Sequence, residues 1–208
     1  MKIIDLSTWK RAGHYQFFHS MDYPQYNICM NLDITHFLKK IKEHRLPFYY
    51  AMTYAAMEAV NDVEEFRYRI HGEQVVLYDK IHPSFTEMIP GDDLFKMVTV
   101  NLEDTIEGFV ASAGKKADSQ KDYFPLPELS RDDIVYVTCI PWISFTHLSH
   151  TIRLNRDDAV PRISWGKYFK EGDKVKLPFS VQVSHAFCDG IHVGRYVELL
   201  QAYLDSVE

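Results

Sequence analysis

The chain has few cysteines, and they are poorly spaced for crosslinking or for binding metal. Among 208 residues only Cys29, Cys139 and Cys188 occur, and no Cys-x-x-Cys pair is present. Neither a disulfide framework nor a zinc site is therefore expected. The sequence also lacks any run of about 18 apolar residues, so no membrane-spanning helix is expected. The first residues carry too short an apolar run for a signal peptide, which favours a reducing cytoplasm.

The chain also has no excess of positively charged residues. The formal net charge is −6, so no general affinity for nucleic acid or for an anionic membrane is expected. The chain has 46% hydrophobic and 25% charged residues, a composition that excludes disordered, collagen-like and coiled-coil classes. Aromatic residues reach 14%, which indicates large packed surfaces or a ligand site walled by rings.

The chain also lacks internal repeats, low-complexity stretches and any Gly- or Ser-rich linker. Its length suits one large domain, so residues 1–208 are interpreted as a single domain. Local loop-rich segments are expected at residues 22–25, 89–93, 114–128 and 155–162, where turn-forming residues gather.

Helical and strand patterns alternate along the chain. Ile134–Ile140 is nearly all apolar, which is typical of a buried strand. Val193, Val197, Leu200 and Leu204 recur at helical spacing. The patterns predict helices over residues 35–45, 47–60, about 103–116 and from 191 onward, and strands over 74–78, 95–102, 134–140, 162–168 and 175–183. This order predicts an α/β fold with a mixed sheet.

The segment Ser184–Gly190 is the best candidate for chemistry. It lies between a predicted strand and the last predicted helix, where α/β proteins often present reactive groups. His185 is the side chain there that can act as a base near neutral pH, and Asp189 follows four residues later. From spacing alone a structural interpretation is favoured, in which Asp189 caps the helix and His185 is an interior histidine.

Ten histidines raise the question of a metal site. His147 and His150 form a His-x-x-His pair, but the pattern supplies no third ligand. The sequence therefore predicts no metal.

Four blocks of the sequence resemble the chloramphenicol acetyltransferase family. The segment from Ser180 to Gln201 is similar to its C-terminal signature, which is built around His-x-x-x-Asp-Gly, and His185 and Asp189 take the named positions. The blocks Trp9–Phe18, Thr138–Phe145 and Pro161–Tyr168 resemble further family motifs and occur in family order.

The resemblance implies the fold of coenzyme A-dependent acyltransferases, a two-layer sandwich with helices packed on a large mixed sheet. It implies O-acetyl transfer from acetyl-CoA to a hydroxyl of chloramphenicol, in a direct ternary complex with His185 as general base. It also implies a homotrimer in which His185 and much of the acceptor pocket come from different subunits. An alcohol needs such a base, because its pKa is far above 7.

The same resemblance assigns supporting roles. Thr138 stands where the family has an oxyanion-binding serine, so its hydroxyl is the expected oxyanion donor. Ser164 stands where the family has a threonine that holds a water, so the two hydroxyl residues are exchanged. Asp189 is expected to pair with Arg11 and to support the site structurally.

The remaining site residues are also expectations from the resemblance. Those expected near acetyl-CoA are Ser164, Lys167, Tyr168, Trp142 and Tyr49. Lys170, Lys174 and Lys176 are nearby, although a solvated hairpin explains them equally well. Those expected around the acceptor are Phe17, Phe18, Tyr123, Phe124 and His150.

The acceptor residues depart from the family pattern. Phe18 lacks a phenolic hydroxyl found in the family, and His150 stands where an apolar residue is typical. Chloramphenicol is the first candidate acceptor, and a different hydroxylated small molecule is the alternative. Acyltransferase cores of 2-oxo acid dehydrogenase complexes and condensation domains share the signature, and a non-catalytic relative that only binds a ligand is a further alternative.

Overall fold

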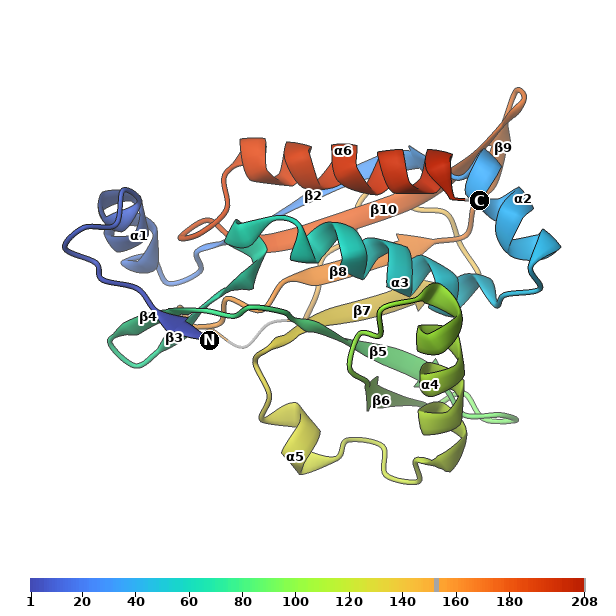
Figure 1. Cartoon of the computed structure of the whole chain (residues 1–208), viewed down its shortest axis with the longest axis horizontal. Helices are drawn as coiled ribbons and strands as arrows, with labels where there is room; N and C mark the ends of the chain where they lie inside the picture. Colours follow the sequence, from blue (N-terminus) through green and yellow to red (C-terminus); the bar gives the residue numbers. More distant parts are fainter. Residues whose placement is uncertain (152–153, 208) are drawn as a thin grey trace.

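The computed structural model describes residues 1–151 and 154–207 (Figure 1). The helices are α1 (Ala12–His19), α2 (Thr35–Glu43), α3 (Phe48–Asn61), α4 (Ile106–Ser119), α5 (Leu126–Leu129) and α6 (Gly190–Ser206), together with the short 3-10 helix η1 (Glu64–Arg67). The strands are β1 (Lys2–Ile3), β2 (Gln25–Asp33), β3 (Tyr68–His71), β4 (Gln74–Leu77), β5 (His82–Met88), β6 (Phe95–Thr99), β7 (Ile134–Ile140), β8 (Arg162–Gly166), β9 (Phe169–Glu171) and β10 (Lys174–Ser184). No helix in these two ranges is long and apolar enough to span a membrane.

A mixed seven-stranded sheet forms the centre of the molecule. Its strand order is β2-β10-β8-β7-β5-β6, and β9 pairs with β10. Strand β7 is parallel to both neighbours, whereas the other pairs are antiparallel. The predicted mixed sheet is therefore confirmed. Pairing of β2 with β10 brings the N-terminal quarter of the chain beside its last strand.

Helices α3 and α6 pack against each other on one face of this sheet (Figure 1). The β10 residues that face them are apolar, because side chains of a strand alternate between the two faces of the sheet. Phe179 of β10, for example, stacks 6.4 Å from Tyr196 of α6, and both are fully buried. The predicted two-layer arrangement of helices on a sheet is confirmed.

The opposite face of the sheet is polar. Cys29, Ser180, Ser164 and Thr138 lie in register on the adjacent strands β2, β10, β8 and β7. The segment after β7 lies over part of this face, because the carbonyl of Leu148 accepts a hydrogen bond from the Asn27 side chain at 2.8 Å. The hydroxyls of Ser164 and Ser180 are fully buried on this polar face, whereas that of Thr138 borders cavities.

Some elements differ from the sequence-based predictions. The predicted loop over residues 114–128 is wrong, since α4 continues to Ser119 and α5 follows. Thr105 caps α4 by accepting from the amide of Gly108, so this helix also begins later than predicted. The predicted strand over residues 74–78 is observed as β4, whereas strands β1, β2, β3 and β5 were not predicted. In β2, alternation of Tyr26, Ile28, Met30 and Leu32 was the signal for a strand.

Candidate active site

His185 follows β10 directly, where the chain turns toward α6. Its amide donates to the carbonyl of Pro24 at 2.7 Å, so the turn is tied to the residue just before β2. The imidazole stacks on Phe18 of α1, with ring centroids 3.8 Å apart and planes 5° apart. Tyr26 of β2 packs at 4.7 Å against the ring, tilted by 46°. The side chain is 36% exposed, so the ring reaches the surface instead of being sealed in the core.

Arg11 and Asp189 form the predicted ion pair beside this histidine. Two guanidinium nitrogens of Arg11 donate to the two carboxylate oxygens at 2.6 and 2.7 Å. Arg11 also donates to the carbonyls of Ala186 at 2.8 Å and of His185 at 3.0 Å. Its hydrogen bonds hold the pKa of Asp189 below the ordinary value. One arginine therefore fixes the turn that carries His185.

The two nitrogens of the His185 ring have different surroundings. Nδ1 is buried and lies 3.2 Å from an oxygen of Asp189, without hydrogen-bond geometry to any group of the described residues. Because Nδ1 is covered while the side chain is partly exposed, the accessible edge of the ring is the one that carries Nε2. That nitrogen is the one available to exchange a proton with a ligand.

Thr138 lies between two cavities at the ends of β5, β6 and β7. One has a volume of about 590 Å³ and the other of about 350 Å³. Thr138, Thr86 and Phe95 line both of them. The larger cavity also contains Tyr49 and Trp142, which were predicted for the donor side. The smaller contains Phe124 and His150, which were predicted for the acceptor side.

A second imidazole approaches the polar face near Thr138. His150 Nε2 lies 3.4 Å from the hydroxyl of Ser164, which is fully buried and in register with Thr138. Burial, and then the charge of Arg162, lower the pKa of His150. The smaller cavity therefore presents a neutral imidazole at neutral pH.

Several predicted residues line neither cavity and are exposed. Phe17 is 61% exposed and contacts Phe18 edge-on, at 5.1 Å between ring centroids. Tyr123 is 46% exposed and does not line either cavity. Lys167 is exposed, and the neighbouring Tyr168 packs edge-on, at 5.7 Å, against Phe48, which lines the larger cavity. Tyr168 thus continues the aromatic wall of that cavity outward.

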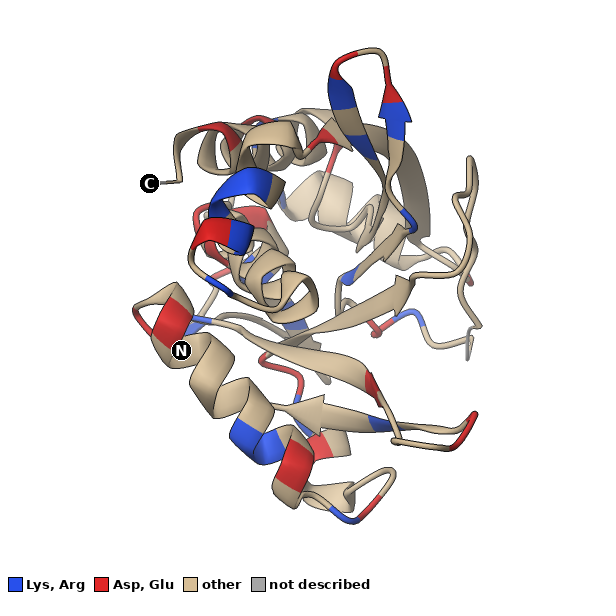
Figure 2. Ribbon diagram, turned by 90° about the vertical axis from the view of Figure 1, so that its right-hand side faces the viewer, with Lys and Arg blue, Asp and Glu red and all other residues tan. Residues whose placement is uncertain are grey.

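The β9–β10 hairpin carries interleaved positive and negative charges (Figure 2, top). Lys174 and Lys176 approach Asp33, with N···O distances of 2.9 and 3.6 Å. Lys174 remains 63% exposed, as expected of a solvated hairpin. The pairing fits the structural interpretation of these two lysines.

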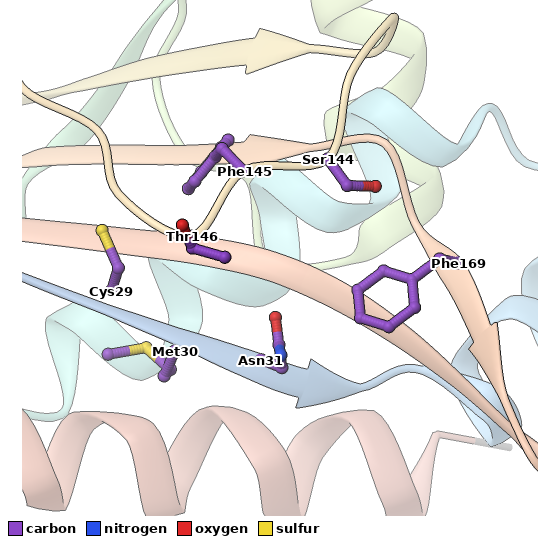
Figure 3. A pocket seen from close by; sticks show the side chains of 7 residues that line it. All are labelled: Cys29, Met30, Asn31, Ser144, Phe145, Thr146 and Phe169. Carbon is purple, nitrogen blue, oxygen red and sulfur yellow. The ribbon is translucent and has the colours of Figure 1, made fainter.

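A third cavity, of about 470 Å³, contains none of the predicted site residues (Figure 3). It lies between β2, the segment after β7 and β9. Its lining residues are Cys29, Met30, Asn31, Ser144, Phe145, Thr146 and Phe169. Over the residues that the structure describes, no group of three His, Cys, Asp or Glu side chains is placed to hold a metal ion.

His185 and Thr138 of one chain are far apart. Thr138 pairs with Ser164 and Ser164 with Ser180, whereas His185 lies five residues beyond Ser180. At about 3.3 Å per residue and 4.8 Å per strand, the separation is roughly 19 Å. The expected base and the expected oxyanion donor therefore do not meet within a single chain.

Tyr26, His192 and Glu65 lie near His185 or its turn and were not found from the sequence. Tyr26 contacts His185 from a strand that was not predicted, and burial raises the pKa of its hydroxyl. His192, in the first turn of α6, accepts from the backbone amide of Asp189 at 2.8 Å and approaches Glu65 at 3.4 Å. The signal for His192 was its position three residues after Asp189, where a capping-box residue stands.

Comparison with known proteins gives one consistent family. The family model described as chloramphenicol acetyltransferase matches residues 1–201. A chloramphenicol acetyltransferase of Klebsiella sp is 32% identical over 98% of this chain and 93% of its own length, and chloramphenicol acetyltransferase 2 of Escherichia coli is 31% identical over 98% and 97%.

Solved structures agree with the sequence comparison. A chloramphenicol acetyltransferase has a TM-score of 0.90 at 24% identity, covering 98% of this chain and 99% of its own. A dihydrolipoamide acetyltransferase of Azotobacter vinelandii shares the fold with a TM-score of 0.69 at 14% identity, covering 94% of this chain and 86% of its own. The predicted acyltransferase fold is confirmed, and the chain belongs to the chloramphenicol acetyltransferase family, a family of acetyltransferase enzymes.

Proposed function

We propose that this protein transfers an acetyl group from acetyl-CoA to the hydroxyl of a small molecule, with chloramphenicol as first candidate. The observation that carries the proposal is the accessible imidazole of His185, held by the bonds of Arg11 to Asp189 and to two backbone carbonyls. The names of the relatives support chloramphenicol as acceptor. The polar wall formed by His150 and Arg162 keeps another hydroxylated acceptor as the alternative.

In the proposed reaction, Nε2 of His185 takes the proton of the acceptor hydroxyl as the oxygen attacks the thioester carbonyl. The new C–O bond forms, the C–S bond breaks, and the thiolate leaves with the proton that His185 returns. Acetyl-CoA supplies the activated thioester when bound. Thr138 donates a hydrogen bond to the oxyanion that develops between these steps.

The cavities support direct transfer between two bound substrates. Thr138 borders both, so a donor in the larger and an acceptor in the smaller cavity would meet at its hydroxyl. On this assignment Tyr49 and Trp142 serve the donor, and Phe124 and His150 serve the acceptor. The family resemblance adds Ser164, Lys167 and Tyr168 on the donor side and Phe17, Phe18 and Tyr123 on the acceptor side. A covalent route through the cavity thiol is disfavoured, since burial raises the pKa of Cys139 to about 12 and the thiolate is the nucleophile.

The roughly 19 Å between His185 and Thr138 leads us to propose sites shared between subunits of a homotrimer. In such a site, His185 of one subunit faces Thr138 and the cavities of the next. The polar face of the sheet would then be covered by the neighbouring subunit. We place the enzyme in the cytoplasm, where acetyl-CoA is available.

A thiol-release assay with acetyl-CoA and a panel of hydroxylated compounds tests the function. Acceptor-dependent release is expected, with chloramphenicol among the substrates, and it should fall roughly 100- to 10,000-fold in His185→Ala because the base is lost. Release that is independent of acceptor, or unchanged in His185→Ala, contradicts the proposal. Tight binding of chloramphenicol without release would identify a binding-only relative.

Thr138→Ala and Thr138→Ser test the oxyanion role. Removal of the hydroxyl is expected to lower kcat by roughly 100- to 1,000-fold, as for other oxyanion donors, with little change in KM. Serine keeps the donor and should retain most of the rate. Equal losses in both variants would show that the threonine methyl, and not the hydroxyl, matters.

A further inference from the structure

His192 lies under the catalytic turn, in contact with two elements. Its side chain, in the first turn of α6, is 14% exposed, and that of Glu65 in η1 is 21% exposed. Nδ1 of His192 accepts a hydrogen bond from the backbone amide of Asp189 at 2.8 Å. Nε2 lies 3.4 Å from Oε1 of Glu65, whose Oε2 is buried without a hydrogen-bond partner among the described residues.

These contacts show which nitrogen carries the proton in the neutral ring of His192. Because Nδ1 accepts, the proton of the neutral ring sits on Nε2 and faces the carboxylate of Glu65. This is the geometry of a capping box, with histidine at the position where glutamate or glutamine usually accepts from the N-cap amide. Protonation would place a second donor on Nδ1, opposite the amide of Asp189, and break this bond.

The charged surroundings of His192 are mixed. Glu65 and Asp189 favour its protonated form, whereas Arg11 and Arg195 disfavour it. Burial is the largest influence and lowers the pKa of His192, so the accepting, neutral form persists at neutral pH.

Asp189, whose backbone amide His192 binds, contacts both Arg11 and His185. Asp189 binds Arg11 through both oxygens and lies 3.2 Å from Nδ1 of His185. Arg11 in turn binds the carbonyl of His185. A displacement of the Asp189 backbone would therefore move both the carboxylate and the carbonyl that orient the imidazole. Misplacement by about 1 Å is enough to cost an enzyme roughly 100-fold in rate.

We propose that His192, anchored by Glu65, is a positioning residue for His185 and acts through the backbone amide of Asp189. His192 touches no substrate in this proposal. It sets the orientation of the imidazole and couples that orientation to its own protonation. The proposal deepens the acetyl-transfer function and rests on it for its kinetic consequences, whereas its effect on the His185 ring is independent of any substrate.

A matched pair of variants in the full chain tests the proposal. His192→Leu removes the acceptor, whereas His192→Gln keeps a side-chain oxygen at the capping-box position. His192→Leu is expected to lower kcat roughly 10- to 100-fold with KM changed less than about threefold, and to shift the ¹⁵N resonances of the His185 ring. His192→Gln should restore both. Parent-like kcat and His185 resonances in His192→Leu, or equal losses in a folded His192→Gln, would overturn the proposal.

Glu65→Gln supplies a second test that does not depend on whether His192→Leu folds. The amide oxygen still accepts from Nε2–H, but the charge that favours protonated His192 is gone. In the parent, the His185 resonances are expected to shift at the pH midpoint at which His192 itself titrates. In Glu65→Gln, the midpoint of His192 and the matching shift of the His185 resonances should both move to lower pH. If the His185 resonances do not shift as His192 titrates, in the parent and in Glu65→Gln alike, the proposal would be overturned. Coupled resonances in a parent without transferase activity would instead contradict acetyl transfer and leave the positioning role standing.

Discussion

At the scale of single residues, one arginine holds the turn that carries His185, the proposed base. Arg11 alone makes four hydrogen bonds, two to Asp189 and two to carbonyls of the turn. Its side chain is 13% exposed and that of Asp189 is 33% exposed, so the pair is screened only in part. Loss of one partner therefore leaves a charge with little water around it.

Asp189→Ala is expected to lower both activity and stability. Stranding the Arg11 charge should cost up to about 3 kcal/mol, less than for a fully buried pair because water reaches Asp189. Thermal denaturation and the thiol-release assay measure the two effects together. Asp93→Ala, in an exposed loop, is the matched control and should change neither. Parent-like Tm and rate in Asp189→Ala would show that the pair is unimportant.

The same carboxylate predicts how stability depends on pH. The pKa of Asp189 is lowered in the folded protein by its hydrogen bonds to Arg11. A lowered folded-state pKa contributes stability above the unfolded value of about 3.9, and that contribution is lost as pH falls through the folded-state pKa. Asp189→Asn should remove it, so the decline in Tm from pH 7 to pH 3 should be shallower than in the parent. Parallel declines would contradict the linkage.

At the scale of elements, one glycine holds the segment after β7 against β8. A Cβ at Gly166 would lie 2.7 Å from the carbonyl oxygen of Ile143 and 3.0 Å from the ring of Phe145. The next residue fixes the same approach, since the amide of Lys167 donates to Ile143 at 2.7 Å and its carbonyl accepts from Ser144 at 2.6 Å. This segment continues from Trp142, which lines the larger cavity.

Gly166→Ala is therefore expected to push the segment away from β8. Overpacking of this kind costs about 1–3 kcal/mol, so Tm should fall and KM for acetyl-CoA should rise. Gly194→Ala, in the middle of α6, is the control. Nothing lies within 4 Å of its added Cβ, and alanine favours a helix by roughly 0.5–1 kcal/mol. Equal effects of the two substitutions would argue against the close approach.

At the scale of the whole molecule, the separation of His185 from Thr138 leads to a mixing experiment. His185→Ala and Thr138→Ala should each be nearly inactive alone. An equal mixture of the two variants, denatured and refolded together, should regain about a quarter of the parent activity if the trimer shares its sites. With random assembly, about a quarter of the interfaces pair a subunit that carries His185 with one that carries Thr138. Sedimentation should show a trimer in the same sample. A mixture as inactive as its components, or a monomer at assay concentration, would contradict shared sites.

The sequence predicted the long elements best, because each carried a periodic pattern of its own. The strand over residues 134–140 and the helix near residue 191 are observed within a residue of the prediction. Strand β4 was predicted over residues 74–78 and is observed at Gln74–Leu77. The two residues of β1 are too few for a pattern, and β1 exists because it pairs with β4. The predicted helix over residues 103–116 passes through Gly114, and α4 in fact continues to Ser119.

By itself, the sequence determined the family and its class of enzyme and singled out His185 as the proposed base, because these inferences depend on short motifs that lie in order along the chain. The family resemblance also anticipated the pair of Arg11 with Asp189, but only the tertiary structure showed that Tyr26, Phe18, His192 and Glu65 lie around His185 and its turn. Phe18, Tyr26 and Arg11 reach His185 through the pairing of β2 with β10, and His192 reaches Glu65 through the packing of α6 on η1. Such contacts join residues more than a hundred positions apart, and no periodicity along the chain encodes a pairing between distant strands.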